Sequence, residues 1–233
     1  MAAKEPYVIA IDGPSGSGKG SLAVNIARTL NFHLLDSGAI YRLLALKAMR
    51  QGIDLDNADD VLTVLDDFNI RFETDDELTI PILDEEDVSK EIRREDAGDA
   101  ASRVARHDKV RKRLLDVQRA FFKPPGLVAD GRDMGTVVFP KARYKFFLYA
   151  SIEVRAQRRY KQLKNMGLSA NIAHLLEELA ERDERDQNRS ASPLVPAEDA
   201  LIVDSSLLDL SQVTELVLSH ITDSGEEIGN RSL

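Results

Sequence analysis

Residues 7–21, YVIAIDGPSGSGKGS, join a short apolar run to a glycine-rich loop that ends in a lysine. The loop fits G-x-x-x-x-G-K and stands between a predicted strand, Tyr7–Ile11, and a helix predicted to begin near Gly20. Glycines let backbone N–H groups surround phosphate oxygens, and the following helix directs its positive end at them. Lys19 adds charge for the β- and γ-phosphates. An accidental glycine-rich turn is the alternative, but it leaves the flanking strand, helix and lysine unexplained. The sequence therefore predicts ATP binding by Gly13, Pro14, Ser15, Gly16, Ser17, Gly18, Lys19, Gly20 and Ser21.

One position departs from the general pattern. Ser or Thr usually follows the lysine, whereas this chain has Gly20 there and Ser21 next. Ligation of Mg²⁺ by that hydroxyl is therefore an open point. The G-K-G-S form resembles the loop of nucleoside monophosphate kinases more than that of GTPases or motor ATPases.

Four more short apolar runs are typical of buried parallel strands. Helical patterns follow several of them, and strands that alternate with helices predict an α/β sheet whose ligands bind at the carboxyl ends of the strands. We expect a five-stranded parallel P-loop core. The four runs are His33–Asp36, Leu127–Asp130, Lys145–Tyr149 and Leu201–Asp204.

Residues 54–122 interrupt this alternation. Their patterns predict helices over Asn57–Phe68, Glu95–Val104 and Lys109–Phe122, with a hairpin of Ile70–Glu73 and Leu78–Leu83 between them. We interpret the interval as a lobe inserted into a core of residues 1–53 and 123–222. The polar residues 223–233 are expected to be a disordered tail.

Composition limits the class of protein. The 233 residues carry a net charge of −9 and no cysteine, which excludes disulfides and thiolate catalysis. No apolar run approaches the ~20 residues of a membrane span, and an acidic surface disfavours nucleic-acid binding. We expect a cytoplasmic protein of one kinase-sized unit, with no membrane or nucleic-acid partner.

Charged side chains follow the predicted strand Leu127–Asp130. Asp130, Arg132 and Asp133 stand where an acid for the metal and groups for a phosphate acceptor would face the glycine loop. A turn cap is the alternative, and it explains one aspartate better than all three side chains.

The predicted helix Ile172–Arg189 changes character along one face. Its inward positions are apolar at first and then become Arg182, Asp186 and Arg189 at the same spacing of three and four. A buried structural ion pair is one explanation. An anionic ligand with hydroxyl groups is the other, because Arg suits phosphate and Asp suits ribose hydroxyls.

A third basic group lies on the predicted helix Ile152–Met166. Arg155, Arg158 and Arg159 share one face of it. A solvated surface explains this spacing, as does a lid over 152–168 that closes arginines over the transferring phosphoryl group and excludes water.

Five segments together resemble the bacterial cytidylate kinases, a family of P-loop nucleoside monophosphate kinases, over nearly the whole chain. The resemblance implies an adenylate-kinase-like core, an α+β insert that binds the nucleoside monophosphate, and a helical lid. The segments are IDGPSGSGKGSLA from Ile11, LLDSGAIYR from Leu34, DVSKEIR from Asp87, LVADGRDMGTVVFP from Leu127 and ERDERDQNRSASPLVPA from Glu181.

The resemblance also implies roles for individual residues. ATP and Mg²⁺ are the implied cofactors, with Ser21 or Asp130 near the metal, often through water. Turnover is assigned to Lys19, Arg132, Arg189 and the three lid arginines. The acceptor phosphate is assigned to Ser37, Arg42, Arg132 and Arg189, the sugar to Tyr41, Arg182 and Asp186, and the base to Ser102, Arg111 and Asp133, beside Gly131.

Hydrogen bonding supports the implied base. Cytosine offers an amine donor that suits Asp133 and acceptors that suit Arg111, whereas uracil would oppose a carbonyl to the carboxylate. Transfer of the γ-phosphoryl group of ATP to CMP or dCMP is thus the expected reaction, by a monomer. A kinase for UMP, AMP or another small acceptor, and a non-catalytic nucleotide-binding regulator, are the alternatives.

Overall fold

The computed structural model describes residues 5–74, 79–165, 167, 169–189 and 192–223. The chain divides into two compact units. The first contains the described residues of Met1–Leu35, Arg119–Asn188 and Ser192–Leu233, and the second contains those of Asp36–Gln118 and Arg189–Ala191. Each unit is described below by itself.

The first unit is built on a five-stranded sheet in the order β2-β6-β1-β7-β8. The pairs β1–β6, β1–β7 and β7–β8 run parallel, and Asp12 stands opposite Gly131 in the register. This confirms the five-stranded α/β fold expected from the sequence. The strands are β1 (Tyr7–Asp12), β2 (His33–Asp36), β6 (Gly126–Gly131), β7 (Tyr144–Tyr149) and β8 (Leu201–Asp204).

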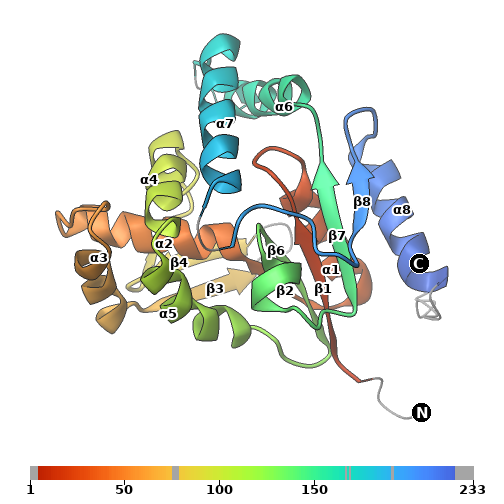
Figure 1. The fold of residues 1–233 in the computed structure, drawn as a ribbon, viewed down its shortest axis with the longest axis horizontal. Coiled ribbons are helices and arrows are strands. Elements are labelled where there is room, and N and C mark those ends of the chain that lie inside the picture. Colours follow the sequence, from red (N-terminus) through yellow and green to blue (C-terminus); the bar gives the residue numbers. More distant parts are fainter. Residues whose placement is uncertain (1–4, 75–78, 166, 168, 190–191, 224–233) are drawn as a thin grey trace. The chain divides into compact units, whose positions relative to one another are not determined.

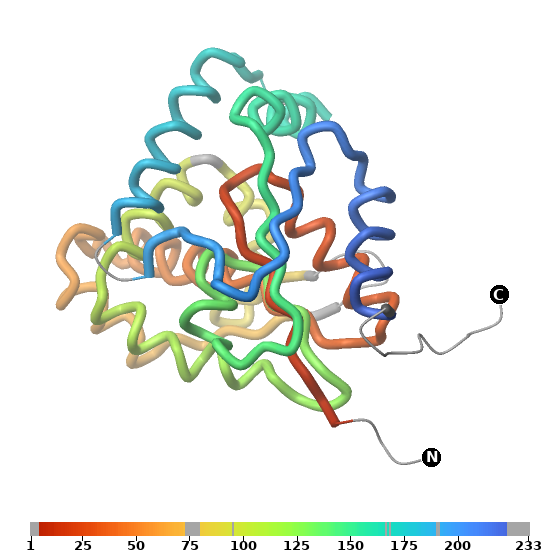
Figure 2. The backbone as a smooth tube through the Cα atoms, turned by 45° about the vertical axis from the view of Figure 1, so that its right-hand side comes forward, coloured from red at the N-terminus to blue at the C-terminus, as the bar shows by residue number. Residues whose placement is uncertain are grey.

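Helices α1 (Lys19–Leu30) and α8 (Leu210–Asp223) pack together on this sheet. Figure 2 shows the two helices side by side, and Asn25 of α1 donates a hydrogen bond to Thr214 of α8. Their buried faces meet strand residues such as Ile11 and Phe146. Each fully buried aliphatic or aromatic side chain contributes roughly 1.5–3 kcal/mol. This core fixes the first turn of α1 at the carboxyl end of β1.

Helices α6 (Ile152–Asn165) and α7 (Ile172–Gln187) follow β7 and lie beyond its carboxyl end (Figure 1). Ala156 and Leu163 of α6 pack against Leu175 and Leu179 of α7 in a small apolar cluster of their own. Between β6 and β7 the chain forms a short π-helix, η2 (Met134–Val138).

The second unit combines helices with a three-stranded antiparallel sheet, β3-β4-β5. Its core joins Leu43 and Leu46 of α2 to Leu83, Val88 and Ile92. The elements are α2 (Ser37–Arg50), α3 (Ala58–Val64), the 3₁₀-helix η1 (Leu65–Asp67), β3 (Ile70–Thr74), β4 (Thr79–Leu83), β5 (Glu86–Asp87), α4 (Glu95–Ala105) and α5 (Asp108–Arg119).

Three expected helix boundaries are wrong. The helix expected over Asn57–Phe68 ends at Val64 and continues as η1. The one expected over Lys109–Phe122 ends at Arg119, shortly before Pro124-Pro125, which cannot continue a helix. The one expected over Ile172–Arg189 ends at Gln187. The expected hairpin tip at Asp75-Asp76 and the tail 224–233 lie outside the described residues.

Candidate functional site

The glycine loop follows β1 directly and leads into α1. Gly13, Gly16 and Gly18 all have positive φ. At Gly13 a Cβ would lie 2.1 Å from the carbonyl oxygen of Leu148, so only glycine fits between the loop and β7. Lys19 is the first residue of α1, and its Nζ donates to the carbonyl of Pro14 at 3.0 Å. The ammonium group therefore lies across the mouth of the loop.

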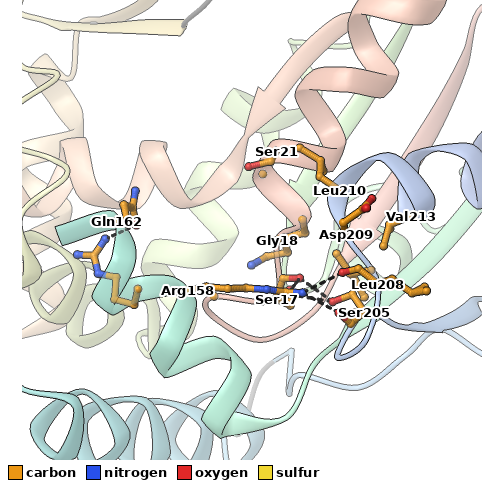
Figure 3. Close-up of a pocket in the computed structure, with 15 residues that line it drawn as sticks. Ser17, Gly18, Ser21, Arg158, Gln162, Ser205, Leu208, Asp209, Leu210 and Val213 are labelled. Atoms are coloured by element: carbon orange, nitrogen blue, oxygen red, sulfur yellow. Dashed lines mark hydrogen bonds between the residues drawn. The ribbon is translucent and has the colours of Figure 1, made fainter. Parts of the chain in front are cut away.

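A pocket of about 580 Å³ opens from this loop, within the volume range of small-molecule sites. Residues 16–21 line one side of it, and residues 208–210 with Val213 line another, as Figure 3 shows. Leu208, Leu210 and Val213 give this second side an apolar surface. The neighbouring Leu207 is 95% exposed. The pocket thus joins a phosphate-binding loop to an apolar wall that suits a nucleotide base.

Arg158 crosses the floor of the pocket. Its guanidinium group donates to the carbonyl of Ser17 at 3.0 Å, and to the carbonyls of Ser205 and Leu208 at 2.6 and 3.4 Å. The buried hydroxyl of Ser205 also donates to the carbonyl of Ser17. Figure 3 shows these bonds as dashed lines. Arg158 therefore ties the glycine loop to the segment between β8 and α8.

Arg155 is buried, with 3% of its surface exposed. Its Nε donates to the carbonyl of Ala150, its Nη1 to the carbonyl of Ser15 at 3.0 Å, and both terminal nitrogens bind the carboxylate of Asp183. Gly16 adjoins it, because a Cβ there would lie 3.1 Å from the Cβ of Arg155. Arg155 thus connects the glycine loop to α7.

The three arginines of α6 therefore do not form one solvated basic face. Arg159 is half-buried, lines the pocket and donates to Gln162 at 2.9 Å. Arg155 and Arg158 hold backbone carbonyls around the loop. Of the lid expected over 152–168, the structure describes α6 and the following Gly167 but neither Met166 nor Leu168.

Two oxygen-bearing side chains lie near the glycine loop and the first turn of α1. Ser21 lines the pocket. The Asp130 carboxylate lies against the first turn of α1, since a Cβ on Gly20 would be 3.2 Å from its Oδ2. Among the described residues, no three His, Asp or Glu side chains are grouped as a metal site. Magnesium usually keeps several waters and takes one or two carboxylates plus substrate phosphates, so this donor set fits it.

The expected acceptor residues of the first unit lie at the ends of β6 and α7. Asp186 is 1% exposed, and its Oδ2 accepts from Nε of Arg132 at 2.8 Å. Arg182 precedes Asp186 by one turn on the same inward face as Leu175 and Leu179. Arg189 is not on this face, because α7 ends at Gln187 and Asn188 caps it. The predicted stripe is therefore confirmed only as far as Asp186.

Asp12 is a buried acid that the sequence reasoning did not assign to the site. Its two oxygens accept from the backbone N–H groups of Met134 and Gly135, each at 2.8 Å. Burial raises the pKa of the Asp12 carboxyl from 3.8 to about 7; the two N–H groups oppose this, and the charges of Asp133 and Asp130 add to it. The sequence signal that could have assigned Asp12 to the site is its position at the carboxyl end of a buried strand, which it shares with Asp130.

The expected acceptor residues of the second unit lie on α2, α4 and α5. Ser37, Tyr41 and Arg42 occupy the first two turns of α2, whose N-cap Asp36 accepts from the N–H of Ala39. The guanidinium of Arg111 lies over the ring of Tyr41, 5.7 Å from its centroid. Ser37 donates to Gln118 at 2.7 Å. The structure thus brings Tyr41 and Arg111 together.

Ser102 of α4 is 4% exposed, and within the described part of the chain its Oγ has no hydrogen-bond partner. Ser17 of the glycine loop is in the same condition. A buried hydroxyl without a partner is costly, and a bound ligand is one way to satisfy it.

The parallel sheet, the glycine loop and its lysine define a P-loop nucleotide-binding protein of the α/β class. A family model for cytidylate kinase matches residues 9–223. The chain belongs to the cytidylate kinase family.

Two named cytidylate kinases agree with this assignment. The cytidylate kinase of Vibrio cholerae is 52% identical over 214 residues, which cover 92% of this chain and 95% of that protein. The cytidylate kinase of Photobacterium profundum is 51% identical over 220 residues, 94% of this chain and 96% of that protein. Among solved structures, a shikimate kinase from Acinetobacter baumannii gives a TM-score of 0.49 at 14% identity, covering 97% of both chains.

Within the ranges the structure describes, no helix combines the length and apolarity that a membrane crossing requires.

Proposed function

We propose that this protein transfers the γ-phosphoryl group of ATP to CMP or dCMP, giving ADP and CDP or dCDP. The observation that carries the proposal is the glycine loop with Lys19 at the mouth of a nucleotide-sized pocket, in a chain of the cytidylate kinase family. Membership in the family supplies the acceptor, and the loop and pocket supply the donor site.

On the donor side, residues 13–21 bind the phosphates of ATP. Backbone N–H groups of the loop surround the β-phosphate, and Lys19 neutralises charge on the β- and γ-phosphates. The base lies against the wall formed by Leu208, Leu210 and Val213. Magnesium, held by the ATP phosphates with Asp130 or Ser21 directly or through water, neutralises charge that develops during transfer.

On the acceptor side, Ser37, Arg42, Arg132 and Arg189 bind the acceptor phosphate. The positive end of the α2 dipole supports this role for Ser37. The sugar lies near Tyr41, Arg182 and Asp186. The burial of Asp186 beside Arg132 supports this, because a sugar hydroxyl there would meet an acceptor already fixed in place.

The base of the acceptor is bound by Ser102, Arg111 and Asp133, with Gly131 beside them. The unsatisfied hydroxyl of Ser102 supports this assignment. The carboxylate of Asp133 accepts from the amine of cytosine, and Arg111 donates to its ring acceptors. In uracil a carbonyl replaces that amine, so its oxygen would face the carboxylate and UMP would bind less well.

Turnover follows from position and charge, with no covalent enzyme intermediate. The acceptor phosphate attacks in line with the leaving ADP through a loose transition state. Arg155, Arg158 and Arg159 are proposed to stabilise its charge when the lid closes. For Arg155 and Arg158, this requires an exchange of their backbone carbonyl partners for phosphate oxygens.

The organisation of the chain is part of the same proposal. Residues 54–122 are assigned to acceptor binding, 152–168 to the lid, and 1–53 with 123–222 to the core. The monomeric state, the cytoplasmic location and the disordered tail stay predictions.

ADP release from ATP and Mg²⁺ tests the function when CMP, dCMP, UMP, AMP and GMP are offered separately. We expect fast release with CMP and dCMP and a much lower kcat/KM with the other three. Release with none of the five would contradict the proposal, and a preference for UMP or AMP would replace the acceptor.

A further inference from the structure

The segment from Gly131 to Gly135 is held at both ends by one residue of the neighbouring strand. At its start, Gly131 stands opposite Asp12 in the β1–β6 register. At its end, the Asp12 carboxylate accepts from the N–H groups of Met134 and Gly135. Arg132 and Asp133 lie between these two attachments.

The two N–H groups need a partner from outside the turn. Within η2 the N–H of Val138 bonds to the carbonyl of Asp133 and that of Phe139 to Met134, a spacing of five residues. Met134 and Gly135 are the first residues of this π-helix, so their N–H groups have no carbonyl of the helix behind them. Asp12 supplies both acceptors.

The carboxylate also has little room to move. Asp12 is 3% exposed, and Gly135 lies beside its Oδ2, since a Cβ there would be 3.4 Å away, in van der Waals contact. Met134, whose N–H binds the other oxygen, is fully buried. A substitution of Asp12 should therefore shift the backbone of the turn, because the close packing leaves no space in which the new side chain could adopt another position.

We propose that Asp12 is a positioning residue of the acceptor site, whose carboxylate fixes the segment from Gly131 to Gly135 and thereby the orientation of Arg132 and Asp133. The inference rests on the proposed function, which assigns Arg132 to the acceptor phosphate and Asp133 to the base. It adds to that function a residue that touches no substrate and acts through the turn.

Asp12→Asn, compared with the wild type at pH 8, where the Asp12 carboxyl is ionised, is the first test. The amide keeps the shape of the carboxylate but opposes its NH₂ group to one of the two backbone N–H groups. We expect a KM for CMP raised about tenfold or more, a smaller CMP-to-UMP ratio of kcat/KM, and a KM for ATP within about threefold of the wild-type value. Hydrogen exchange of Met134 and Gly135 should be faster in the variant.

Two further variants separate positioning from general destabilisation. Asp12→Glu keeps the charge but adds a methylene at a buried position, so its oxygens cannot occupy the same two places, and it should shift the same two parameters for CMP, also if Asp12→Asn fails to fold. Val217→Ala, in the buried face of α8, should lower the Tm while the KM for CMP and the base ratio stay at wild-type values.

Three outcomes would overturn the inference. If Asp12→Asn speeds hydrogen exchange at Met134 and Gly135 but leaves the kinetics with CMP unchanged, Asp12 only stabilises the turn and does not position the acceptor residues. An equal rise in the KM for ATP would assign it to the glycine loop. Wild-type protein that does not phosphorylate CMP would contradict the proposed function itself, and exchange at Met134 and Gly135 would still show whether the attachment exists.

Discussion

Lys19 lies at the mouth of the glycine loop, where its ammonium group meets the carbonyl of Pro14. In the proposed function its charge is needed most when the γ-phosphoryl group is in transfer, and the acceptor is proposed to bind through other residues. We expect Lys19→Met to lower kcat at least 100-fold and to leave the Kd for CMP within about threefold. Steady-state kinetics and calorimetric titration with CMP measure the two effects. A comparable loss of CMP binding would contradict this separation of donor and acceptor residues.

Asp133 is the residue on which base preference should depend. If Asp133 binds the base as proposed, removal of its carboxylate removes both an acceptor for the cytosine amine and the repulsion of the uracil carbonyl. Asp133→Ala should therefore lower kcat/KM for CMP and bring the CMP-to-UMP ratio closer to one, by about tenfold or more. Kinetics with both acceptors at saturating ATP give the ratio, and an unchanged ratio would exclude Asp133 from base recognition.

Asp12 should make the stability of the protein depend on pH. Its pKa is 3.8 in the unfolded chain and is raised to about 7 in the folded state. Between these values the folded state holds a proton that the unfolded state has released, so this contribution to stability is complete below pH 4 and is lost as the pH rises to 7. The free energy of unfolding should fall over this range by up to about 4 kcal/mol relative to Asp12→Asn.

Urea denaturation of both proteins at pH 5 and pH 7.5, without nucleotide or metal, should show about 3 kcal/mol of this difference, because part of it is lost below pH 5. Other carboxyl groups titrate in both proteins, and the comparison with Asp12→Asn removes their contribution. A constant difference between the two proteins would mean that Asp12 ionises normally.

Sequence reasoning reached many residues of the candidate site through local patterns, but it could not reach the function of Asp12. The partners of this carboxylate are two backbone N–H groups more than 120 positions away in the chain. A main-chain partner leaves no trace in residue types. Asp130 and Asp133 were accessible because they stand with an arginine in one short segment.

At the scale of elements, α7 is joined to the glycine loop through a largely buried ion pair with Arg155 of α6. Asp183 lies between Arg182 and Asp186 on α7, and it holds Arg155, which in turn binds the carbonyl of Ser15. Removal of one partner of a buried pair leaves the other charge uncompensated, at a cost of about 3–5 kcal/mol. The pair thus couples the position of α7 to that of the loop.

Asp183→Asn should therefore raise the KM for ATP and lower kcat, each by about tenfold, and lower the Tm. Glu178→Gln is the matched control, since Glu178 lies on the same helix and pairs with the exposed His174. It should leave both constants unchanged. Wild-type kinetics in Asp183→Asn would show that the pair only stabilises the fold.

The end of α7 shows that sequence periodicity predicts the buried face of a helix but not the residue at which the helix ends. A repeat of three and four identified Leu175, Leu179, Arg182 and Asp186 as one face, because that spacing is a property of the helix itself. It also included Arg189, since a repeat carries no information about where a helix stops. Here the end is set by Asn188, whose backbone leaves the helical conformation.

For the molecule as a whole, metal removal should separate catalysis from folding. Magnesium is proposed to bind mainly through ATP, so EDTA should abolish ADP formation and leave the Tm of the nucleotide-free protein unchanged. Excess Mg²⁺ should restore full activity. A lower Tm with EDTA would indicate a metal bound by the protein itself.

The five strands and the alternation with helices followed from apolar runs, but the order β2-β6-β1-β7-β8 did not. Strand order depends on which helix crosses which face, and local sequence does not encode that choice. The boundaries between the two compact units could not be predicted from the sequence either. The second unit begins at Asp36, where the strand pattern passes directly into the helix pattern, whereas the alternation of strands and helices breaks only near residue 54.

The segment that forms the apolar wall of the pocket also gives a place to observe the protein at work. Leu207 is almost fully exposed, next to Leu208, which lines the pocket, and the chain contains no cysteine. A single cysteine introduced at position 207 would be the only thiol available to a maleimide dye. Fluorescence from that dye would report nucleotide entry and departure in real time, without any prior background substitution.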